Sequence, residues 1–193
     1  MKKIFFLFAF TFCVFLAEAQ NKFALQLSDS ALKLIDSSIK YDPTYFVIKY
    51  PNGDVPADKG VCTDVIIRAY RKMGIDLQKE VHEDMTKNFS KYPKTWGLKK
   101  PDTNIDHRRV PNLAVFFSKF GTVKSIETNP TLYVPGDIVT WILPGNLTHI
   151  GLVVNKKSAD GKRFMIVHNI GGGQVMEDVL FKYTITGHYQ YQK

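Results

Sequence analysis

Two hydrophobic periodicities follow one another along this chain of 193 residues, and their order limits the folds open to it. In the first part, apolar side chains recur at helical spacing, which predicts helices over Ala24 to Ile39, Cys62 to Met73, Leu77 to Phe89 and Val110 to Phe120. Beyond residue 133, β-rich segments alternate with turns, which predicts strands over Asp137 to Leu143, His149 to Val154, Phe164 to Asn169 and Thr184 to Tyr191. Tyr45 to Tyr50 adds one earlier short strand. Helices followed by a largely antiparallel sheet indicate an α+β fold.

The first residues are typical of an export signal. Two lysines precede the apolar run Ile4 to Leu16, and Ala17-Glu18-Ala19 provides a small-x-small cleavage site. We therefore expect a signal peptide over residues 1–19, one domain over residues 20–193, and a periplasmic or secreted protein. The apolar run is too short to span a bilayer comfortably, so we expect no stable membrane insertion. Lipid anchoring through Cys13 is the alternative.

The charge pattern argues against one class of partner. The formal net charge is +8, but basic residues occur singly or in pairs, the longest runs being of the kind Lys99-Lys100 and Arg108-Arg109. A scattered excess does not form the basic stripe that nucleic acid requires, and the export signal argues further against that partner. An anionic envelope polymer is a better match to a basic exported protein. The simpler interpretation is that the basic residues form a solvated surface.

Only one cysteine, Cys62, remains once the signal is set aside. It cannot form an intramolecular disulfide, although exported proteins usually use cysteines in pairs. Because Cys62 opens a predicted helix, unpaired backbone N–H groups and the positive end of the helix macrodipole point at its sulfur. They favour the thiolate that a nucleophile requires. The alternative is an inert cysteine packed as a small hydrophobic side chain.

A thiol nucleophile needs a base, and position selects among the five histidines. His149 begins a strand after the turn Pro144-Gly145-Asn146, and His168 ends the next strand. Neighbouring antiparallel strands can bring two such side chains into contact. His149 would then accept the proton of Cys62 while His168 fixes the tautomer of His149. Asn169 is the competing orienting residue, on the opposite face of its strand.

The motifs follow the order of a known family. The sequence resembles the NlpC family of papain-like cell-wall cysteine peptidases, and its wider amidase superfamily, at Cys62, Pro135 to Trp141, His149 to Val154 and Val167-His168. This resemblance implies a papain-like fold, with N-terminal helices packed on a C-terminal antiparallel sheet, and a catalytic set of Cys62, His149 and His168. It also implies that Tyr50 lines the oxyanion site, beside the backbone N–H of Cys62.

The residues around Cys62 depart from that pattern. The NlpC family has Asp before its cysteine and Ser-Gly after it, whereas this chain has Val61 and Thr63-Asp64. Substrate preference is therefore not transferred. A resemblance over nearly the whole chain after the signal is to domain-of-unknown-function family 1287, at Gly53 to Pro56, Gly60 to Val65, Val81 to Met85, Asn104 to Leu113 and Gly187 to Tyr189. That family is largely uncharacterised, so it implies membership rather than an activity.

A charged cluster, Asp106-His107-Arg108-Arg109, precedes one predicted helix. Arg108 or Arg109 could bind a substrate carboxylate in a bidentate manner, and His107 could support the active site from behind. The alternative is a salt-bridge network at the helix start, or a solvated loop. His82-Glu83-Asp84 lacks the His-Glu-x-x-His spacing of a zinc site, so we expect no metal and no cofactor.

The sequence thus predicts an exported cysteine hydrolase that cleaves an amide bond, in peptidoglycan peptides or in another envelope amide, through a Cys-His-His arrangement. Two alternatives stay open: a non-catalytic module that binds an envelope glycan or peptide, and a thioester-based acyltransferase. We expect a monomer with no nucleic-acid partner. The sequence identifies neither the bond that is cut nor what residues 92–109 contact.

Overall fold

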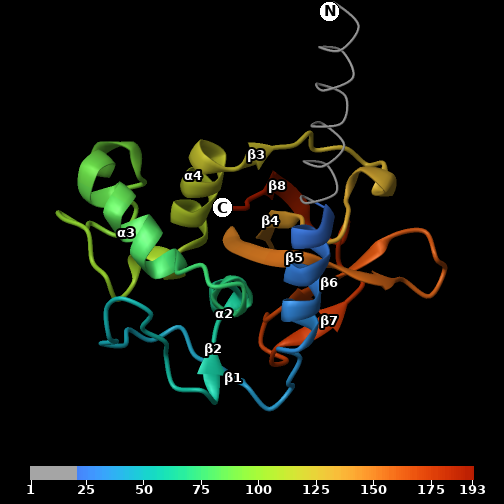
Figure 1. The fold of residues 1–193 in the computed structure, drawn as a ribbon, viewed down its shortest axis with the longest axis horizontal. Helices are drawn as coiled ribbons and strands as arrows, with labels where there is room; N and C mark the ends of the chain where they lie inside the picture. The colour runs from blue at the N-terminus through green and yellow to red at the C-terminus, as the bar shows by residue number, and fades with distance from the viewer. Residues whose placement is uncertain (1–20) are drawn as a thin grey trace, which may run out of the picture.

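A computed structural model describes residues 21–193 (Figure 1). The predicted signal peptide and the alternative anchor at Cys13 lie outside the described residues. Within residues 21–193, no helix is both long enough and apolar enough to cross a membrane.

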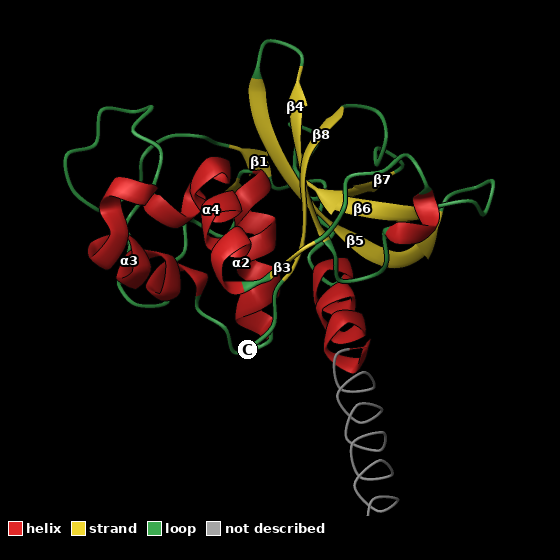
Figure 2. Ribbon diagram, turned by 90° about the horizontal axis from the view of Figure 1, so that it is seen from above, coloured by secondary structure: helices red, strands yellow, loops and turns green. Residues whose placement is uncertain are grey.

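Three helices lie together on one side of the molecule and the large sheet lies on the other (Figures 1 and 2). They are α2 (Cys62–Lys72), α3 (Leu77–Asn88) and α4 (Val110–Phe120). Local signals set their limits: the Asp76 side chain accepts a hydrogen bond from the Lys79 N–H at the start of α3, and α4 has a proline in its first turn. All three helices match their predicted ranges to within a residue or two.

The first predicted helix ends earlier than the sequence pattern indicates. Within the described residues it is helical over 21–32, whereas the prediction ran to Ile39, and it packs Leu27 and Ala31 into the core. Beyond it, Asp36 forms an isolated antiparallel bridge with Gln174. Backbone pairing with a distant segment therefore replaces the last helical turns.

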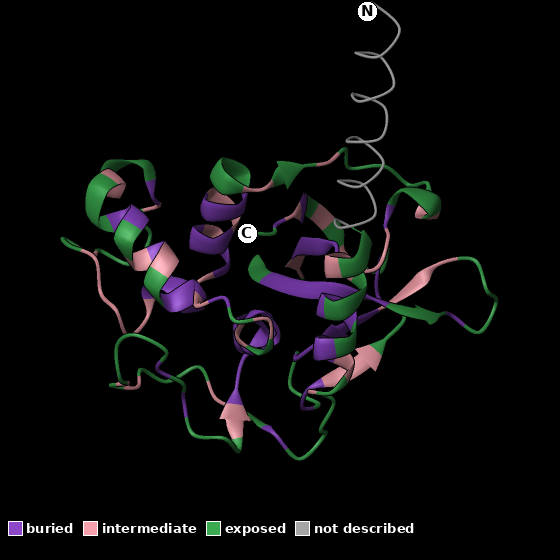
Figure 3. Cartoon of the chain, in the orientation of Figure 1, coloured by how far each residue is buried: buried purple, intermediate pink, exposed green. Residues whose placement is uncertain are grey.

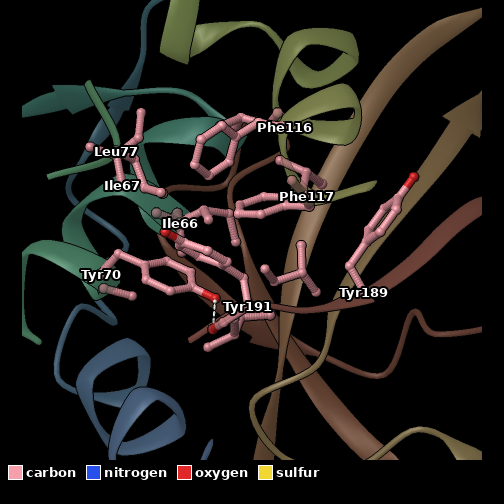
Figure 4. Packing of buried hydrophobic residues seen from close by; sticks show 14 of the residues in the cluster. Ile66, Ile67, Tyr70, Leu77, Phe116, Phe117, Tyr189 and Tyr191 are labelled. Atoms are coloured by element: carbon pink, nitrogen blue, oxygen red, sulfur yellow. Dashed lines mark hydrogen bonds between the residues drawn. The ribbon is translucent and has the colours of Figure 1, made fainter. Parts of the chain in front are cut away.

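Helix α2 is buried along most of its length, as its colour in Figure 3 shows. Side chains of α2, α4 and the C-terminal segment meet in one core, where Tyr70 packs against Phe117 and Tyr191 with ring centroids 6.1 and 5.8 Å away (Figure 4). The Tyr70 hydroxyl donates to the Tyr191 carbonyl at 2.9 Å, so the buried phenol is satisfied. The buried polar side chains of α2 are paired as well, since Arg68 donates to Asp54 Oδ2 at 3.0 Å, which lets the helix lie at the centre of the domain.

The sheet has six strands, in the order β3-β8-β4-β5-β6-β7, and every neighbouring pair is antiparallel. Its members are β3 (Thr122–Val123), β4 (Ile138–Leu143), β5 (Leu147–Lys157), β6 (Phe164–His168), β7 (Val175–Glu177) and β8 (Thr184–Gln190). The four longer strands were predicted, and the α+β class is confirmed. β3 and β7 were not predicted, because two or three residues are too few to show a period.

Strand alternation divides the buried side chains between two faces of the sheet. Ile150 and Leu152 belong to the cluster that includes α2 and α4. Trp141, Val153 and Ile166 belong to a second cluster on the other face. The face occupied by a β5 side chain therefore decides whether it can meet the helices.

One predicted strand is wrong. Tyr45 to Tyr50 forms no strand; instead the Ile48 N–H donates to Asn104 Oδ1 at 2.9 Å and the Tyr45 hydroxyl donates to Asp102 Oδ2 at 2.9 Å. Side chains of the 102–104 segment thus take the place of a partner strand. A short parallel pair, β1 (Lys40–Tyr41) with β2 (Lys59–Gly60), lies on either side of this segment.

Candidate active site

Cys62 is the first residue of α2, and the residues around it fix its position. Val61 is extended and acts as the N-cap, while the Asp64 carboxylate accepts a hydrogen bond from the Val61 N–H at 2.7 Å. This bond is the carboxylate half of a capping box, since the Val61 side chain has no acceptor, and it satisfies a backbone donor that the helix itself leaves open. The departure from the NlpC pattern at Asp64 is therefore a structural feature of this helix start.

Asp64 also holds Arg108. The guanidinium donates from Nε to Asp64 Oδ1 at 2.9 Å and from Nη2 to Oδ2 at 3.0 Å, and both side chains are only 2% exposed. Arg108 Nη1 donates to the Thr44 carbonyl at 3.3 Å. Arg108 is thus paired within the protein, which matches the salt-bridge alternative for this residue.

A groove of about 410 Å³ opens beside the start of α2. Its lining combines the helix start, the 92–109 segment and the tip of the β4–β5 hairpin, and consists of Tyr41, Pro43, Val61, Cys62, Trp96, Ile105, Arg108, Arg109, Val110, Leu147 and Thr148. Leu147 and Trp96 are exposed, so the groove has an apolar and aromatic rim. Cys62 is the nucleophilic side chain that lines it.

The thiol of Cys62 does not have the low pKa that its place at a helix start predicts. Burial raises its pKa to about 12, because Cys62 is only 5% exposed and the charged form is poorly solvated. The backbone N–H groups of Ile150, Thr63 and Cys62 act in the opposite direction, but burial outweighs them. The sulfur therefore carries its proton at neutral pH in this structure.

His149 and His168 are in direct contact, as predicted. His149 Nε2 lies 2.9 Å from His168 Nδ1, and the rings meet edge to face with centroids 5.0 Å apart. His168 Nε2 in turn lies 3.0 Å from Glu177 Oε2 on β7. Both histidines are buried, so the chain His149, His168, Glu177 runs from the interior to a half-exposed carboxylate.

The carboxylate of Glu177 determines which ring nitrogen donates and which accepts in each hydrogen bond of this chain. Ionised Glu177 can only accept, so His168 donates from Nε2, and its Nδ1 is then left to accept from His149 Nε2–H. That assignment leaves Nδ1 of His149 without a proton. This nitrogen has no hydrogen-bond partner within residues 21–193, so it is the atom available to act as a base.

Burial also keeps both imidazoles neutral. It lowers the pKa of His149 to about 3, with a smaller contribution from His168. Burial likewise lowers the pKa of His168, while Glu177 opposes that shift. At neutral pH His149 is therefore unprotonated, and the same burial makes it a weak base in this structure.

Cys62 packs against β5 at the backbone of Ile150, whereas His149 lies on the face of the strand that carries Trp141, and no hydrogen bond joins the thiol to either imidazole in residues 21–193. The backbone N–H of Ile150, the residue directly after His149, contacts the sulfur. The His149 ring itself packs near Trp141, with centroids 5.8 Å apart. A transfer of the thiol proton to Nδ1 would require the two side chains to approach each other.

Gly151 makes room for this arrangement of rings. A Cβ at residue 151 would lie 2.5 Å from Ile166 Cγ2 and 3.3 Å from both His168 Cβ and Trp141 Cζ3. A side chain at this position would therefore displace residues that support the histidine pair.

Tyr50 does not lie at the groove, contrary to the prediction from chain order. Its ring packs edge to face on His82, with centroids 5.2 Å apart. Tyr41 lines the groove instead, and its pKa is raised by burial and by the neighbouring Cys62. The pairing of Tyr41 with Gly60, two residues before Cys62, brings it there.

The remaining predicted residues occupy distinct places. Asn169 is buried and donates to the Gly60 carbonyl at 3.3 Å, so it supports the loop before Cys62 and does not contact His149. His107 is buried near Arg108 and Arg71, and burial lowers its pKa to about 3. Arg109 lines the groove, and its Cζ lies over the Trp96 ring, 4.1 Å from the ring centroid.

Glu177 and Tyr41 are the candidate site residues that the sequence did not indicate. Glu177 lies on the three-residue strand β7, in register with Ile166 of β6. Residues 21–193 contain no group of three or more His, Cys, Asp or Glu side chains placed to hold a metal ion. The chemistry that this arrangement offers is that of a thiol, two linked imidazoles and a carboxylate.

Comparisons with known proteins give a family without a described activity. Residues 28–191 match the family described as a domain of unknown function, DUF1287. The uncharacterised protein YijF of Escherichia coli (strain K12) is 51% identical over 167 residues, which cover 86% of this chain and 81% of that protein. No solved structure matches the chain significantly.

Proposed function

The chain belongs to the DUF1287 family, and from its site we propose that it is an exported cysteine hydrolase with an NlpC-like, papain-like fold. The proposed reaction is cleavage of an amide bond, in peptidoglycan peptides or another envelope amide. The observation that carries the proposal is a groove-lining thiol at the first residue of a helix, beside a strand whose histidine begins the chain His149, His168, Glu177.

The proposed first step begins from a neutral pair, because burial raises the pKa of Cys62 and lowers that of His149. As substrate displaces water from the groove, Nδ1 of His149 takes the thiol proton while the sulfur attacks the scissile carbonyl carbon. The bond to nitrogen then breaks, His149 returns the proton to the departing amine, and the acyl group remains on Cys62 as a thioester. A water molecule, deprotonated by His149, hydrolyses the thioester and restores the thiol.

Backbone donors are available for the negative charge that forms on the carbonyl oxygen. The N–H groups of Cys62 and Thr63 lie at the start of α2, where the helix macrodipole is positive. Tyr41 lines the same groove and is the side-chain donor on this side, in place of Tyr50.

Product analysis tests the proposed reaction. Purified peptidoglycan is incubated with the protein, and newly formed amino groups and soluble fragments are identified by mass spectrometry. An amide hydrolase gives matched new amino and carboxyl termini. A peptide amine added at millimolar concentration distinguishes the acyltransferase alternative, because a transferase passes most acyl groups to the amine despite the excess of water, whereas a hydrolase passes most of them to water. Absence of any new terminus over a set of envelope peptides and amides would contradict the proposal.

A binding module that retains the fold is the second candidate, and one observation favours it. The thiol keeps its proton and no hydrogen bond joins it to His149 within residues 21–193. In that case stem peptides or glycan fragments would bind equally well to the wild type and to Cys62→Ala, and neither would release products.

The carboxylate of Glu177 gives a specific prediction for the proposed mechanism. Glu177→Ala removes the acceptor that fixes the tautomer of His168, so kcat should fall by on the order of tenfold while KM changes little. Glu177→Gln should retain most of the activity, because its amide oxygen can still accept from Nε2. The ¹⁵N chemical shifts of the His149 ring should report a mixed tautomer in the alanine variant alone. Unchanged kcat and ring shifts in Glu177→Ala would show that the carboxylate has no orienting role.

A further inference from the structure

Two adjacent arginines of the groove differ in their partners. The guanidinium of Arg108 is held by Asp64 and by the Thr44 carbonyl. The guanidinium of Arg109 makes no hydrogen bond or ion pair with any residue of 21–193, and its Nη1 atom is buried without a partner. It rests only on the face of Trp96. An arginine has five N–H donors, so this one is available to a ligand.

The nearby acidic residues do not neutralise Arg109. Asp102 accepts hydrogen bonds from Asn104 and from the Tyr45 hydroxyl, and Asp106 accepts from the Asp102 N–H. Both carboxylates act on Arg109 only through space, whereas burial disfavours its charged form. A carboxylate bound at the guanidinium would supply the missing hydrogen bonds and the counter-charge.

The rest of the groove sets the shape of such a ligand. No acidic side chain lines it, and the exposed rings of Trp96 and Tyr41 flank Arg109 and Cys62. Trp96 lies against the guanidinium, with Arg109 Cζ 4.1 Å from the ring centroid, and the N–H groups of Arg109 that have no partner are the donors for a ligand.

We propose that this groove binds its ligand through a carboxylate, with Arg109 as the counter-ion and Cys62 beside the same ligand. The ligand class is then an acidic peptide or acyl compound rather than a neutral one. That the ligand is the amide substrate rests on the proposed function, but binding of the carboxylate by Arg109 does not.

The test uses two probes of nearly the same size. Iodoacetate carries a carboxylate and iodoacetamide is neutral, and both alkylate thiols. The second-order alkylation rate of Cys62 is measured with each probe at pH 9 and low salt, by mass spectrometry of the peptide that contains Cys62. The ratio of the iodoacetate rate to the iodoacetamide rate should fall about three- to tenfold in Arg109→Gln, as expected for loss of one partly screened charge at the site.

Two further variants make the result specific. Lys99→Gln removes an exposed cation from the same segment and should leave the ratio at the wild-type value. Arg109→Lys should keep a ratio between those of the wild type and Arg109→Gln, and it serves if Arg109→Gln proves unfolded by circular dichroism. Equal ratios in the wild type and in the folded Arg109 variants would overturn the proposal. The alkylation rates are measured without turnover. A negative result would therefore contradict carboxylate binding by Arg109 and leave the proposed function untouched.

Discussion

Replacing His149 with alanine is expected to lower the rate of amide hydrolysis by about two to four orders of magnitude, the usual contribution of a positioned general base. In the proposed mechanism the thiol of Cys62 would depend on this base more than an ordinary catalytic thiol does, because burial raises its pKa to about 12 and little thiolate is present at neutral pH. Without the Nδ1 atom of His149, no group in the proposed mechanism takes the proton as the sulfur attacks. The effect should appear in kcat, since His149 does not line the groove.

A second histidine provides the control for this prediction. His82 lies on α3, where it packs against Tyr50 and lies 3.7 Å from Asp106 Oδ2, and it does not line the groove, so His82→Ala should keep wild-type turnover. Both variants are compared with the wild type for release of amino groups, after circular dichroism has confirmed that each is folded. Comparable rates in His149→Ala and His82→Ala would exclude His149 as the base.

Replacing Asp64 with alanine is expected to lower the free energy of unfolding by about 3–5 kcal/mol, as is typical when one member of a buried ion pair is removed. The side chain of Arg108 is only 2% exposed and would lose both of its hydrogen bonds to the Asp64 carboxylate. Because a guanidinium does not lose its proton, the charge would stay buried without a partner. The Val61 N–H would also lose its acceptor at the start of α2. The change therefore affects the helix start that positions Cys62.

An exposed ion pair gives the matched control for Asp64. Asp178 pairs with Arg163 on the surface, where the two side chains are 31% and 30% exposed. Asp178→Ala should cost only about 0–1 kcal/mol, because water replaces the lost contact. Urea unfolding of both variants measures the difference. A loss below about 1 kcal/mol in Asp64→Ala would show that Arg108 finds other partners and that this pair does not hold the helix start.

The elements predicted from the sequence are those whose signals are local. Apolar spacing together with start and stop residues placed α2, α3 and α4, because a helix makes its hydrogen bonds within one segment. Tyr45 to Tyr50 has a β-rich composition but no partner strand. The backbone N–H of Ile48 donates to the Asn104 side chain instead. Strand formation depends on a distant partner, so composition alone was insufficient.

The site residues that the sequence predicted are likewise those with a local signal. His149 and His168 were predicted together because each lies at a definite place on a strand, and their contact at 2.9 Å follows from antiparallel pairing. Glu177 joins them only through the register of β7, which no period reveals. The choice between Arg108 and Arg109 depended on Asp64, whose acidic side chain in the first turn of a buried helix was the available signal.

Two expectations about the site changed for physical reasons. The helix start does direct N–H groups at the sulfur of Cys62, but the cost of burying a thiolate is larger than their effect. Tyr41 replaces Tyr50 at the groove because the β1–β2 pair brings residue 41 to the loop before Cys62. Neither burial nor this pairing can be read from the residues near Cys62 alone.

The most direct measurement of the central claim compares the wild type with Cys62→Ala on purified peptidoglycan, with new amino groups counted over time. The account predicts steady release by the wild type and none above the no-enzyme background by the variant, while both proteins show the same circular dichroism and thermal unfolding. Release by folded Cys62→Ala at the wild-type rate would contradict the assignment of Cys62 as the nucleophile.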